Sequence, residues 1–315
     1  MRKIYLFPLF LAAFLVCAMT FNDPLNSIYP LEGVNPPVYY AASKPVSEGD
    51  NGRLVVIVIH GWGGGTGILK EVKDLQKSLG GIYVVSPLFP RAQIMKSHKI
   101  ELDGRAIWND SWPRDLTKPG LPDDDWRGGG DANGTQLSSY DVIDTLLAKF
   151  SDRKLYPNLN KIALVGFSAG GQFVGRYVAV GKGLPVSDIE ISYAAMAPST
   201  QLIPSSGETW HYGLKNRPRY SLSLDDEQIM ENLRTRRCFY ACGLRDTLER
   251  DLDKTPPAMR QGKNRYVRFL NFKAMVESDS VWKANSTFHV FESLGHQASH
   301  AYDDPSFLEF ILESE

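Results

Sequence analysis

The chain has 315 residues, of which 43% are apolar and 23% are charged, a composition typical of a globular protein with a large buried core. Its 35 basic and 36 acidic side chains nearly balance, which argues against a nucleic-acid-binding protein and against an acidic tail. The sequence has no internal repeat or low-complexity tract, so solenoids and propellers are not supported.

The first eighteen residues have the pattern of a signal peptide. Two basic residues precede the apolar run from Ile4 to Val16, and small residues follow it up to Ala18. We expect cleavage near Ala18, so that residues 1–18 are removed and residues 19–315 form one secreted or periplasmic domain. An uncleaved membrane anchor is the alternative, although the run is shorter than the ~20 residues that span a bilayer and Pro8 interrupts it.

Two cysteines remain once the signal peptide is removed, and both lie in the segment RCFYACG. A strand there would place Cys238 and Cys242 on one face, about 13 Å apart at ~3.3 Å per residue. This separation exceeds the ~7 Å limit between the Cα atoms of a disulfide. We therefore expect two buried free thiols, while an irregular loop would reopen the question of pairing. The spacing fits no common zinc pattern.

The hydrophobic pattern predicts a doubly wound α/β fold, with a mostly parallel sheet, helices on both faces and long loops at the carboxyl end. Residues 21–51 suit an extended arm or short edge strands, and 53–59 (RLVVIVI) a strand buried on both faces. A helix over 66–79 and a strand over 82–88 follow, and this alternation favours parallel strands with right-handed crossovers. The later expected elements are helices over 140–150 and 304–312, strands over 189–195, 237–243 and 286–291, and a long loop over 198–236.

A connection of about fifty residues, 89–137, breaks the alternation of strands and helices. Long connections inside a compact domain are more often functional than idle, so we expect a lid or a pocket wall at the carboxyl end of the sheet. Its acidic run, 123–131, could suggest calcium, but the run lacks the ligand spacing of an EF-hand. We expect this run to be a solvated loop.

The most informative motif is Gly-Phe-Ser-Ala-Gly, at 166–170. An apolar run precedes it and a helical pattern follows, which predicts a strand, a tight turn and a helix. Such a turn exposes the hydroxyl of Ser168 and leaves the backbone N–H of Ala169 available to an oxyanion. The motif alone is a weak signal, so its context must decide.

A second glycine-rich turn, HGWGGG, follows the strand expected over 53–59. It lacks the Gly-Lys-Ser/Thr of a P-loop and a well-spaced dinucleotide fingerprint. The turn suits an oxyanion loop in which the N–H of Trp62 and that of Ala169 point at the same place. An ordinary glycine-rich connection is the alternative. We expect His60 to form structural hydrogen bonds and not to act as a base.

A serine nucleophile needs a base, and that base needs an orienting carboxylate. Asp246 stands just past the strand expected over 237–243, and His296 just past the strand expected over 286–291. The carboxyl ends of these strands would converge at the top of the sheet, and the chain order Ser, Asp, His is the one this type of fold uses. Asp251 and Asp253 are competing acids, further into the polar segment.

The other histidines carry weaker signals. His300 lies four residues after His296, a spacing that could suggest a metal pair, but no Glu follows His296 and no third ligand is apparent. We therefore expect no metal site. His98 and His211 are expected in loops, and His289 in a strand.

From HGWGGG through GFSAGG and GLRD to LGH, the chain resembles the α/β-hydrolase superfamily over essentially the whole mature sequence. More narrowly, FSAGGQFVGRY, YGLKNRP and QGKNRYVR resemble a group of secreted α/β hydrolases of mostly unassigned substrate. The resemblance implies Ser168 as nucleophile, His296 as base and Asp246 as orienting acid, and it implies no particular substrate. Those relatives are expected to carry His before the nucleophile, where this chain has Phe167.

These observations predict an exported serine hydrolase that cleaves an ester, or less readily an amide, through an acyl-enzyme and without a metal or organic cofactor. The expected substrate is a small-molecule, lipid or glycan ester. No nucleic-acid partner and no stable membrane span are expected in the mature chain. An acyltransferase or a peptidase would use the same triad, and a catalytically silent module could bind a glycan or protein through the loops. Ser at the turn disfavours dehalogenase and dienelactone-type chemistry.

Overall fold

A computed structural model describes residues 27–62, 68–90, 104–108, 125–184 and 188–313. The described strands are β1 Ser27–Pro30, β2 Tyr39–Ala42, β3 Leu54–Ile59, β4 Tyr83–Pro87, β5 Lys161–Phe167, β6 Glu190–Met196, β7 Cys238–Gly243 and β8 Ser286–Phe291. The described α-helices are α1 Ile68–Ser78, α3 Ser139–Phe150, α4 Ala169–Val180, α5 Asp226–Thr235, α6 Pro256–Gln261, α7 Arg265–Glu277, α8 Ser280–Ala284, α9 Ala298–Tyr302 and α10 Pro305–Leu312. Short 3₁₀ helices are η1 Val46–Glu48, η2 Trp126–Gly128 and η3 Arg219–Ser221.

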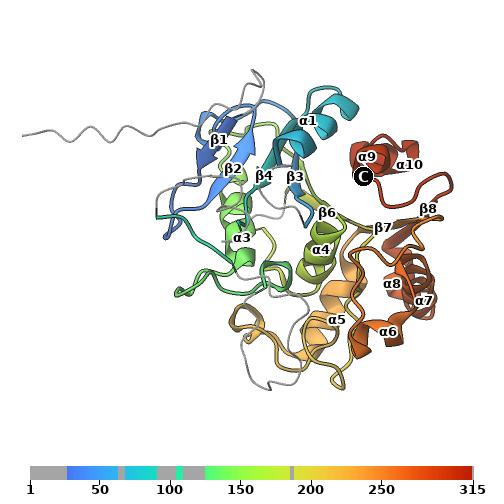
Figure 1. The fold of residues 1–315 in the computed structure, drawn as a ribbon. Coiled ribbons are helices and arrows are strands. Elements are labelled where there is room, and N and C mark those ends of the chain that lie inside the picture. Colours follow the sequence, from blue (N-terminus) through green and yellow to red (C-terminus); the bar gives the residue numbers. More distant parts are fainter. Residues whose placement is uncertain (1–26, 63–67, 91–103, 109–124, 185–187, 314–315) are drawn as a thin grey trace, which may run out of the picture.

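The described strands form one sheet in the order β1-β2-β4-β3-β5-β6-β7-β8. The strands from β4 to β8 in this order are parallel to their neighbours, whereas β1 and β2 join antiparallel at one edge. Helices α1, α9 and α10 lie on one side of the sheet and α3, α4 and α5 on the other (Figure 1). The predicted doubly wound, mostly parallel fold is confirmed, and the amino-terminal segment contributes short edge strands as expected.

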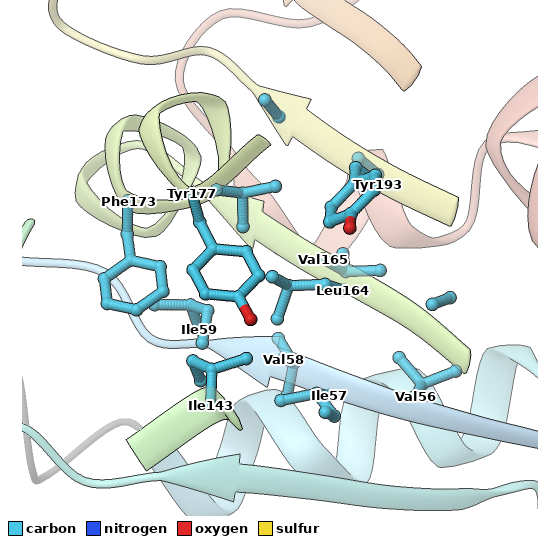
Figure 2. Close-up of a cluster of buried hydrophobic side chains, with 14 of the residues drawn as sticks. Val56, Ile57, Val58, Ile59, Ile143, Leu164, Val165, Phe173, Tyr177 and Tyr193 are labelled. Atoms are coloured by element: carbon cyan, nitrogen blue, oxygen red, sulfur yellow. The ribbon is translucent and has the colours of Figure 1, made fainter. Parts of the chain in front are cut away.

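The core forms where β3 and β5 run side by side through the centre of the sheet. Their side chains are buried on both faces, as the uninterrupted apolar runs predicted. Figure 2 shows Val58 of β3 and Leu164 of β5 beside Tyr177 of α4, and Ile59 of β3 beside Phe173 of the same helix. Burial of such side chains contributes about 1.5–3 kcal/mol each, so this layer fixes α4 and the turn before it.

Both cysteines of β7 are buried and free, which confirms the expectation for these two thiols. Burial raises the pKa of Cys238 to about 12. Since the thiolate is the reactive form of cysteine, these groups are unreactive near neutral pH. No helix among the described ranges combines the length and the apolar content required to cross a bilayer.

The segment 198–236, expected as a loop, contains helix α5. Asp225 caps this helix by accepting from the N–H of Gln228 at 2.8 Å, while Gln228 Oε1 accepts from the N–H of Asp225 at 3.0 Å. Ile229 and Leu233, one turn apart, are the residues that the helix buries. The capping pair Asp225 and Gln228 is a sequence signal for the start of this helix. The stretch is otherwise polar, with few apolar residues to indicate a buried helical face.

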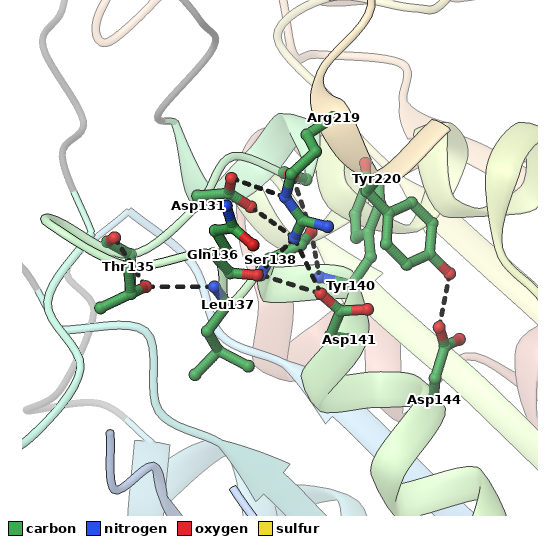
Figure 3. Close-up of polar contacts among 12 residues, drawn as sticks. Asp131, Thr135, Gln136, Leu137, Ser138, Tyr140, Asp141, Asp144, Arg219 and Tyr220 are labelled. Atoms are coloured by element: carbon green, nitrogen blue, oxygen red, sulfur yellow. Dashed lines mark hydrogen bonds and ion pairs between the residues drawn. The ribbon is translucent and has the colours of Figure 1, made fainter. Parts of the chain in front are cut away.

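The same segment is tied to α3 by a network of polar contacts (Figure 3). The Arg219 guanidinium bridges Asp131, at 2.9 Å, and Asp141, at 3.2 Å. The Tyr220 hydroxyl next to it donates to Asp144 of α3 at 2.7 Å. These bonds hold η3 against the helical layer, so the long segment has a fixed course over the sheet.

The described part of the acidic run, 125–131, is not the solvated loop that its composition suggested. Asp125 is 5% exposed and Arg127 is 3% exposed. The Arg127 Nε donates to both carboxylate oxygens of Asp125, at 2.9 and 3.0 Å. Burial opposes ionisation of Asp125, but the charge and hydrogen bonds of Arg127 outweigh it and hold the pKa of Asp125 below its usual value. Residues 91–103 and 109–124, where the lid was expected, lie outside the described residues.

The turn between β5 and α4 is a place where backbones approach too closely for any side chain. A Cβ on Gly166 would collide with the backbone of Gly170, and a Cβ on Gly170 would collide with the carbonyl of Ile59 in β3. A Cβ on Gly171 would meet the carbonyl of Met196 in β6. The glycines of the motif therefore allow α4 to begin directly against three neighbouring strands.

Replacing Gly170 by Ala tests this close packing. We expect Gly170→Ala to lower the free energy of unfolding by about 3 kcal/mol, because the atoms in its way are backbone and cannot move aside. Gly175→Ala in the same helix is the matched control, since its nearest contact would be Ala195 Cβ at an ordinary 3.7 Å. That change should be neutral or stabilising by up to about 1 kcal/mol. Urea unfolding of both variants checks this, and equal stabilities would contradict it.

The buried pair of Asp125 and Arg127 gives a second prediction. Asp125→Ala should cost about 3–5 kcal/mol of unfolding free energy near neutral pH, because it leaves a buried guanidinium without its carboxylate. The double change Asp125→Leu with Arg127→Met should recover much of this loss. The stabilisation from Asp125 is present above its unfolded-state pKa and is lost as the pH falls through the lowered folded-state value. A cost below about 1 kcal/mol for Asp125→Ala would show that the pair is not desolvated.

Candidate active site

Ser168 sits at the junction of β5 and α4 in a backbone conformation that non-glycine residues rarely adopt, with φ 59° and ψ −114°. Its N–H donates to the carbonyl of Met196 at 2.9 Å, and its carbonyl accepts from the N–H of Gln172 at 3.0 Å. The close packing of the flanking glycines and these two bonds hold the strained turn in place. The side chain is left partly exposed at the carboxyl edge of the sheet.

The structure brings Ser168, His296 and Asp246 together from three separate strand ends. His296 Nε2 lies 2.8 Å from Ser168 Oγ, and His296 Nδ1 lies 2.6 Å from Asp246 Oδ2. The arrangement suits the tautomer in which Nδ1–H donates to the carboxylate and Nε2 accepts from the hydroxyl. The Asp246 side chain is 1% exposed and the His296 side chain 31% exposed, so the acid is enclosed while the imidazole reaches solvent.

The competing acids lie elsewhere. Asp253 is buried and accepts hydrogen bonds from the Tyr212 hydroxyl at 2.6 Å and from the N–H of Thr255 at 2.8 Å. Asp251 is exposed and lines the pocket beside Ser168. Neither is the carboxylate that contacts His296.

The loops that carry Asp246 and His296 are pressed against each other. The N–H of Arg245 donates to the carbonyl of Leu294 at 2.9 Å. A Cβ on Gly243 would collide with the carbonyls of Leu294 and Gly295, so only glycine fits at this crossing. The two loops therefore pack backbone against backbone, which fixes the distance between acid and base.

Phe167, which precedes the nucleophile, packs on the imidazole of His296 with ring centroids 4.9 Å apart. The ring is 5% exposed, so it forms an apolar wall on one side of His296. The proteins that this chain resembles are expected to have His at this position, so the apolar wall results from having Phe167 there instead. The contact restricts how the imidazole can rotate away from Ser168.

An open pocket lies in front of Ser168. Its lining residues are Trp62, Arg127, Ser168, Ala169, Gln172, Ser199 and Asp251. Trp62 and Ala169 thus border the pocket that contains the serine, as the oxyanion interpretation requires. Ala169 is the first residue of α4, and the N–H of such a residue has no acceptor within its own helix.

The loop after β3 is anchored by hydrogen bonds to Phe89 and Glu71. His60 is buried, and its Nε2 accepts from the N–H of Phe89 at 3.0 Å while Nδ1 contacts the carbonyl of Gly61 at 2.8 Å. The N–H of Gly61 donates to Glu71 Oε1 at 3.2 Å, and burial raises the pKa of Glu71 to about 7. His60 therefore forms structural hydrogen bonds, as expected. Together the contacts fix the position of Gly61, the residue before Trp62.

Three lining residues were not singled out from the sequence. The guanidinium of Arg127 lies over the ring of Trp62, 4.7 Å from its centroid. Arg127 also donates to Gln172 Oε1 at 3.4 Å. Ser199 lies three residues after β6, and Gln172 lies in the first turn of α4. Position after a strand end, the signal that found Asp246 and His296, could also have found Ser199.

The remaining histidines are accounted for separately. His211 lies in a buried loop and His289 in β8, where it is 3.2 Å from Asp304. His300 is an exposed residue of α9, and His98 lies outside the described residues. Within the described ranges, no group of three or more His, Cys, Asp or Glu side chains is arranged to hold a metal ion.

Comparison with known proteins identifies the fold. Poly(aspartic acid) hydrolase-1 from Sphingomonas sp. KT-1 is similar with a TM-score of 0.64 and 19% identity, over 92% of this chain and 100% of that one. LpqC, a poly(3-hydroxybutyrate) depolymerase from Bordetella parapertussis, is similar with a TM-score of 0.62 and 18% identity, over 91% and 94% of the two chains. No family model and no curated protein sequence matches the chain.

These likenesses span nearly the whole of each chain, while fewer than one residue in five is identical. They therefore establish architecture and carry no information about substrate. The chain has the fold of the α/β-hydrolase superfamily, as its motifs predicted.

Proposed function

We propose that this protein is a serine hydrolase that cleaves ester bonds. Ser168 is the nucleophile, His296 the general base and Asp246 the orienting acid. The observation that carries the proposal is the continuous hydrogen-bonded chain from Ser168 Oγ through both ring nitrogens of His296 to Asp246 Oδ2. This arrangement can remove the serine proton and support the positive charge that His296 then acquires.

In the acylation half-reaction, Oγ of Ser168 attacks the ester carbonyl carbon as its proton passes to His296 Nε2. The carbonyl oxygen becomes an oxyanion, which the backbone N–H groups of Trp62 and Ala169 would stabilise. The C–O bond to the leaving alcohol then breaks, and His296 returns the proton to that alcohol. The acyl group remains on Ser168.

In the deacylation half-reaction, a water molecule gives a proton to His296 and attacks the acyl-enzyme. Collapse of the second tetrahedral intermediate breaks the bond to Oγ, and His296 reprotonates Ser168. The carboxylic acid leaves. Asp246 accepts from Nδ1–H throughout and holds the imidazole in the tautomer that both steps need.

Hydrolysis is favoured over acyl transfer because His296 is 31% exposed and the pocket opens to solvent, so water can reach the base. The lining of the pocket includes Arg127, Gln172 and Ser199 beside Trp62, which suits an ester with polar substituents. The two similar structures bear the names of a hydrolase and a depolymerase of polymers, and the open pocket could likewise take one end of a longer chain.

The protein is further proposed to be exported, with residues 1–18 as a signal peptide. The support is the basic start, the apolar run and the small residues up to Ala18 in the sequence. Amino-terminal sequencing of the protein recovered outside the cytoplasm should begin close to residue 19. A full-length amino terminus on the recovered protein would contradict this part.

Removing the nucleophile tests the proposed function. Ser168→Ala should lower kcat for an activated ester by at least about three orders of magnitude, because covalent catalysis is lost while the fold and pocket stay. Circular dichroism and thermal unfolding check that the variant is folded. A folded variant that hydrolyses the ester as fast as the unaltered protein would overturn the assignment of Ser168.

Replacing the acid separates Asp246 from its competitor. Asp246→Asn keeps the shape but no longer accepts from Nδ1–H as a carboxylate does, so kcat should fall by on the order of 10³–10⁴. Asp251→Asn, at an exposed acid away from His296, should change kcat by less than about tenfold. The two variants are compared in one ester assay. The reverse ranking would assign the acid to Asp251.

A further inference from the structure

A second buried charge lies beside Asp246, on the side away from His296. Arg265 Nη1 is 3.6 Å from Asp246 Oδ1, and the two side chains are 2% and 1% exposed. At this distance the contact is an ion pair and not a hydrogen bond. Asp246 Oδ2 serves His296, while Oδ1 has no hydrogen-bond partner and faces the guanidinium.

The guanidinium is held in place by groups other than the carboxylate. Arg265 Nη1 donates to the carbonyl of Arg250 at 3.2 Å, and Nη2 donates to the carbonyl of Asp251 at 2.6 Å. Next along the chain, the N–H of Tyr266 donates to the carbonyl of Asp246 at 3.3 Å. The first turn of α7 is therefore bonded to both ends of the loop that carries the acid and the pocket residue Asp251.

A carboxylate buried to this extent needs a compensating charge. Without one, burial favours the protonated form, and a protonated Asp246 would be a poor acceptor for His296 Nδ1–H. Burial also lowers the pKa of Arg265, while the charge of Asp246 raises it. Arginine nevertheless stays protonated throughout the working range of pH. The pair thus places a permanent positive charge behind the acid.

On the basis of the proposed function, we infer that Arg265 is a positioning residue for the Ser168–His296–Asp246 chain. Its charge keeps Asp246 ionised and opposes the binding of a second proton by the Asp246–His296 pair. Its bonds to the carbonyls of Arg250 and Asp251 hold the acid loop at the pocket.

The positive charge of Arg265 opposes proton uptake by the Asp246–His296 pair. When His296 takes up a proton, the group carries plus one on Arg265, minus one on Asp246 and plus one on His296. Without the charge of Arg265, the added proton meets only a negative neighbour, so it binds at higher pH. This holds whether the proton resides on His296 or on Asp246, because the pair titrates as a unit.

Other groups near the pair do not change between the variants proposed below. Burial raises the pKa of the Cys242 thiol, which therefore stays neutral. The charge of Asp251 raises the pKa of Arg265. The charge of Asp253 raises the pKa of Arg268, and the charge of Arg265 lowers it. Within the described ranges, the hydrogen bonds and the ring contact of the His296 side chain are with Ser168, Asp246 and Phe167. A difference between variants at Arg265 therefore reports the change at Arg265.

Arg265→Gln and Arg265→Lys separate charge from structure. Gln is neutral but can still donate to the carbonyl of Asp251, whereas Lys keeps the charge and loses the paired donors. For kcat/KM of ester hydrolysis, the midpoint of the acid limb should move up by about 0.5–1 pH unit in Arg265→Gln. In Arg265→Lys the midpoint of the acid limb should stay within about 0.2 pH unit of its value in the unaltered protein, while kcat falls.

Arg268→Gln is the matched control, because Arg268 is a buried arginine one turn along α7. It donates to the carbonyls of Ser199 and Asp253, at 2.5 and 2.7 Å, and not to the loop carbonyls that Arg265 holds. We expect it to lose thermal stability but to move the acid limb by less than half of the shift in Arg265→Gln. Equal shifts in the two variants would contradict a specific action of Arg265.

Proton NMR titration of the His296 ring gives a readout that needs no turnover, with the signal identified by its loss in His296→Gln. A higher titration midpoint in Arg265→Gln than in the unaltered protein, with Arg265→Lys unchanged, supports the inference. Unchanged midpoints in all three folded proteins overturn it, even if activity is lost, because the role of Arg265 is then purely structural. If the unaltered protein shows no Ser168-dependent hydrolysis, the proposed function fails, whatever the NMR result.

Discussion

The site depends on how closely the backbone after β5 approaches its neighbours. Gly170 touches the end of β3 and Gly171 the end of β6, so α4 starts where side chains would not fit. That contact forces Ser168 into a positive φ and turns its hydroxyl outward. It also places the first N–H of α4 beside the loop that carries Trp62. The strained conformation of Ser168 persists because the buried layer of β3, β5 and α4 fixes the surrounding backbone.

Buried arginines replace regular secondary structure in holding the loops above the sheet. Arg176 of α4 donates to the carbonyl of His211 at 3.0 Å and to Thr200 Oγ1 at 2.9 Å, which ties the segment after β6 to the helix. Arg268 binds the carbonyls of Ser199 and Asp253 in the same way. Each guanidinium offers several donors in a rigid plane, so one side chain can satisfy carbonyls from two loops at once. These bonds fix the segment around Ser199, the loop part of the pocket wall, against α4 and α7.

The strands and the three aligned side chains could be predicted because their signals are local. A continuous apolar run followed by glycine marks a central strand, and a polar residue just past such a run marks the carboxyl edge. The burial of Asp125 could not be predicted, since an acidic run is solvated unless a partner neutralises it. The pairing of Arg265 with Asp246 joins residues 19 positions apart through the packing of α7 on β7, and no periodicity reports that contact.

Activation of Ser168 can be measured by mass spectrometry of the protein after reaction with a fluorophosphonate. We expect a single covalent adduct on the peptide that contains Ser168, and no adduct in His296→Gln, where the base is absent. Denatured protein should not react, because activation requires the folded arrangement. If the folded protein forms no adduct, or if His296→Gln is modified equally well, then Ser168 is not a nucleophile activated by His296.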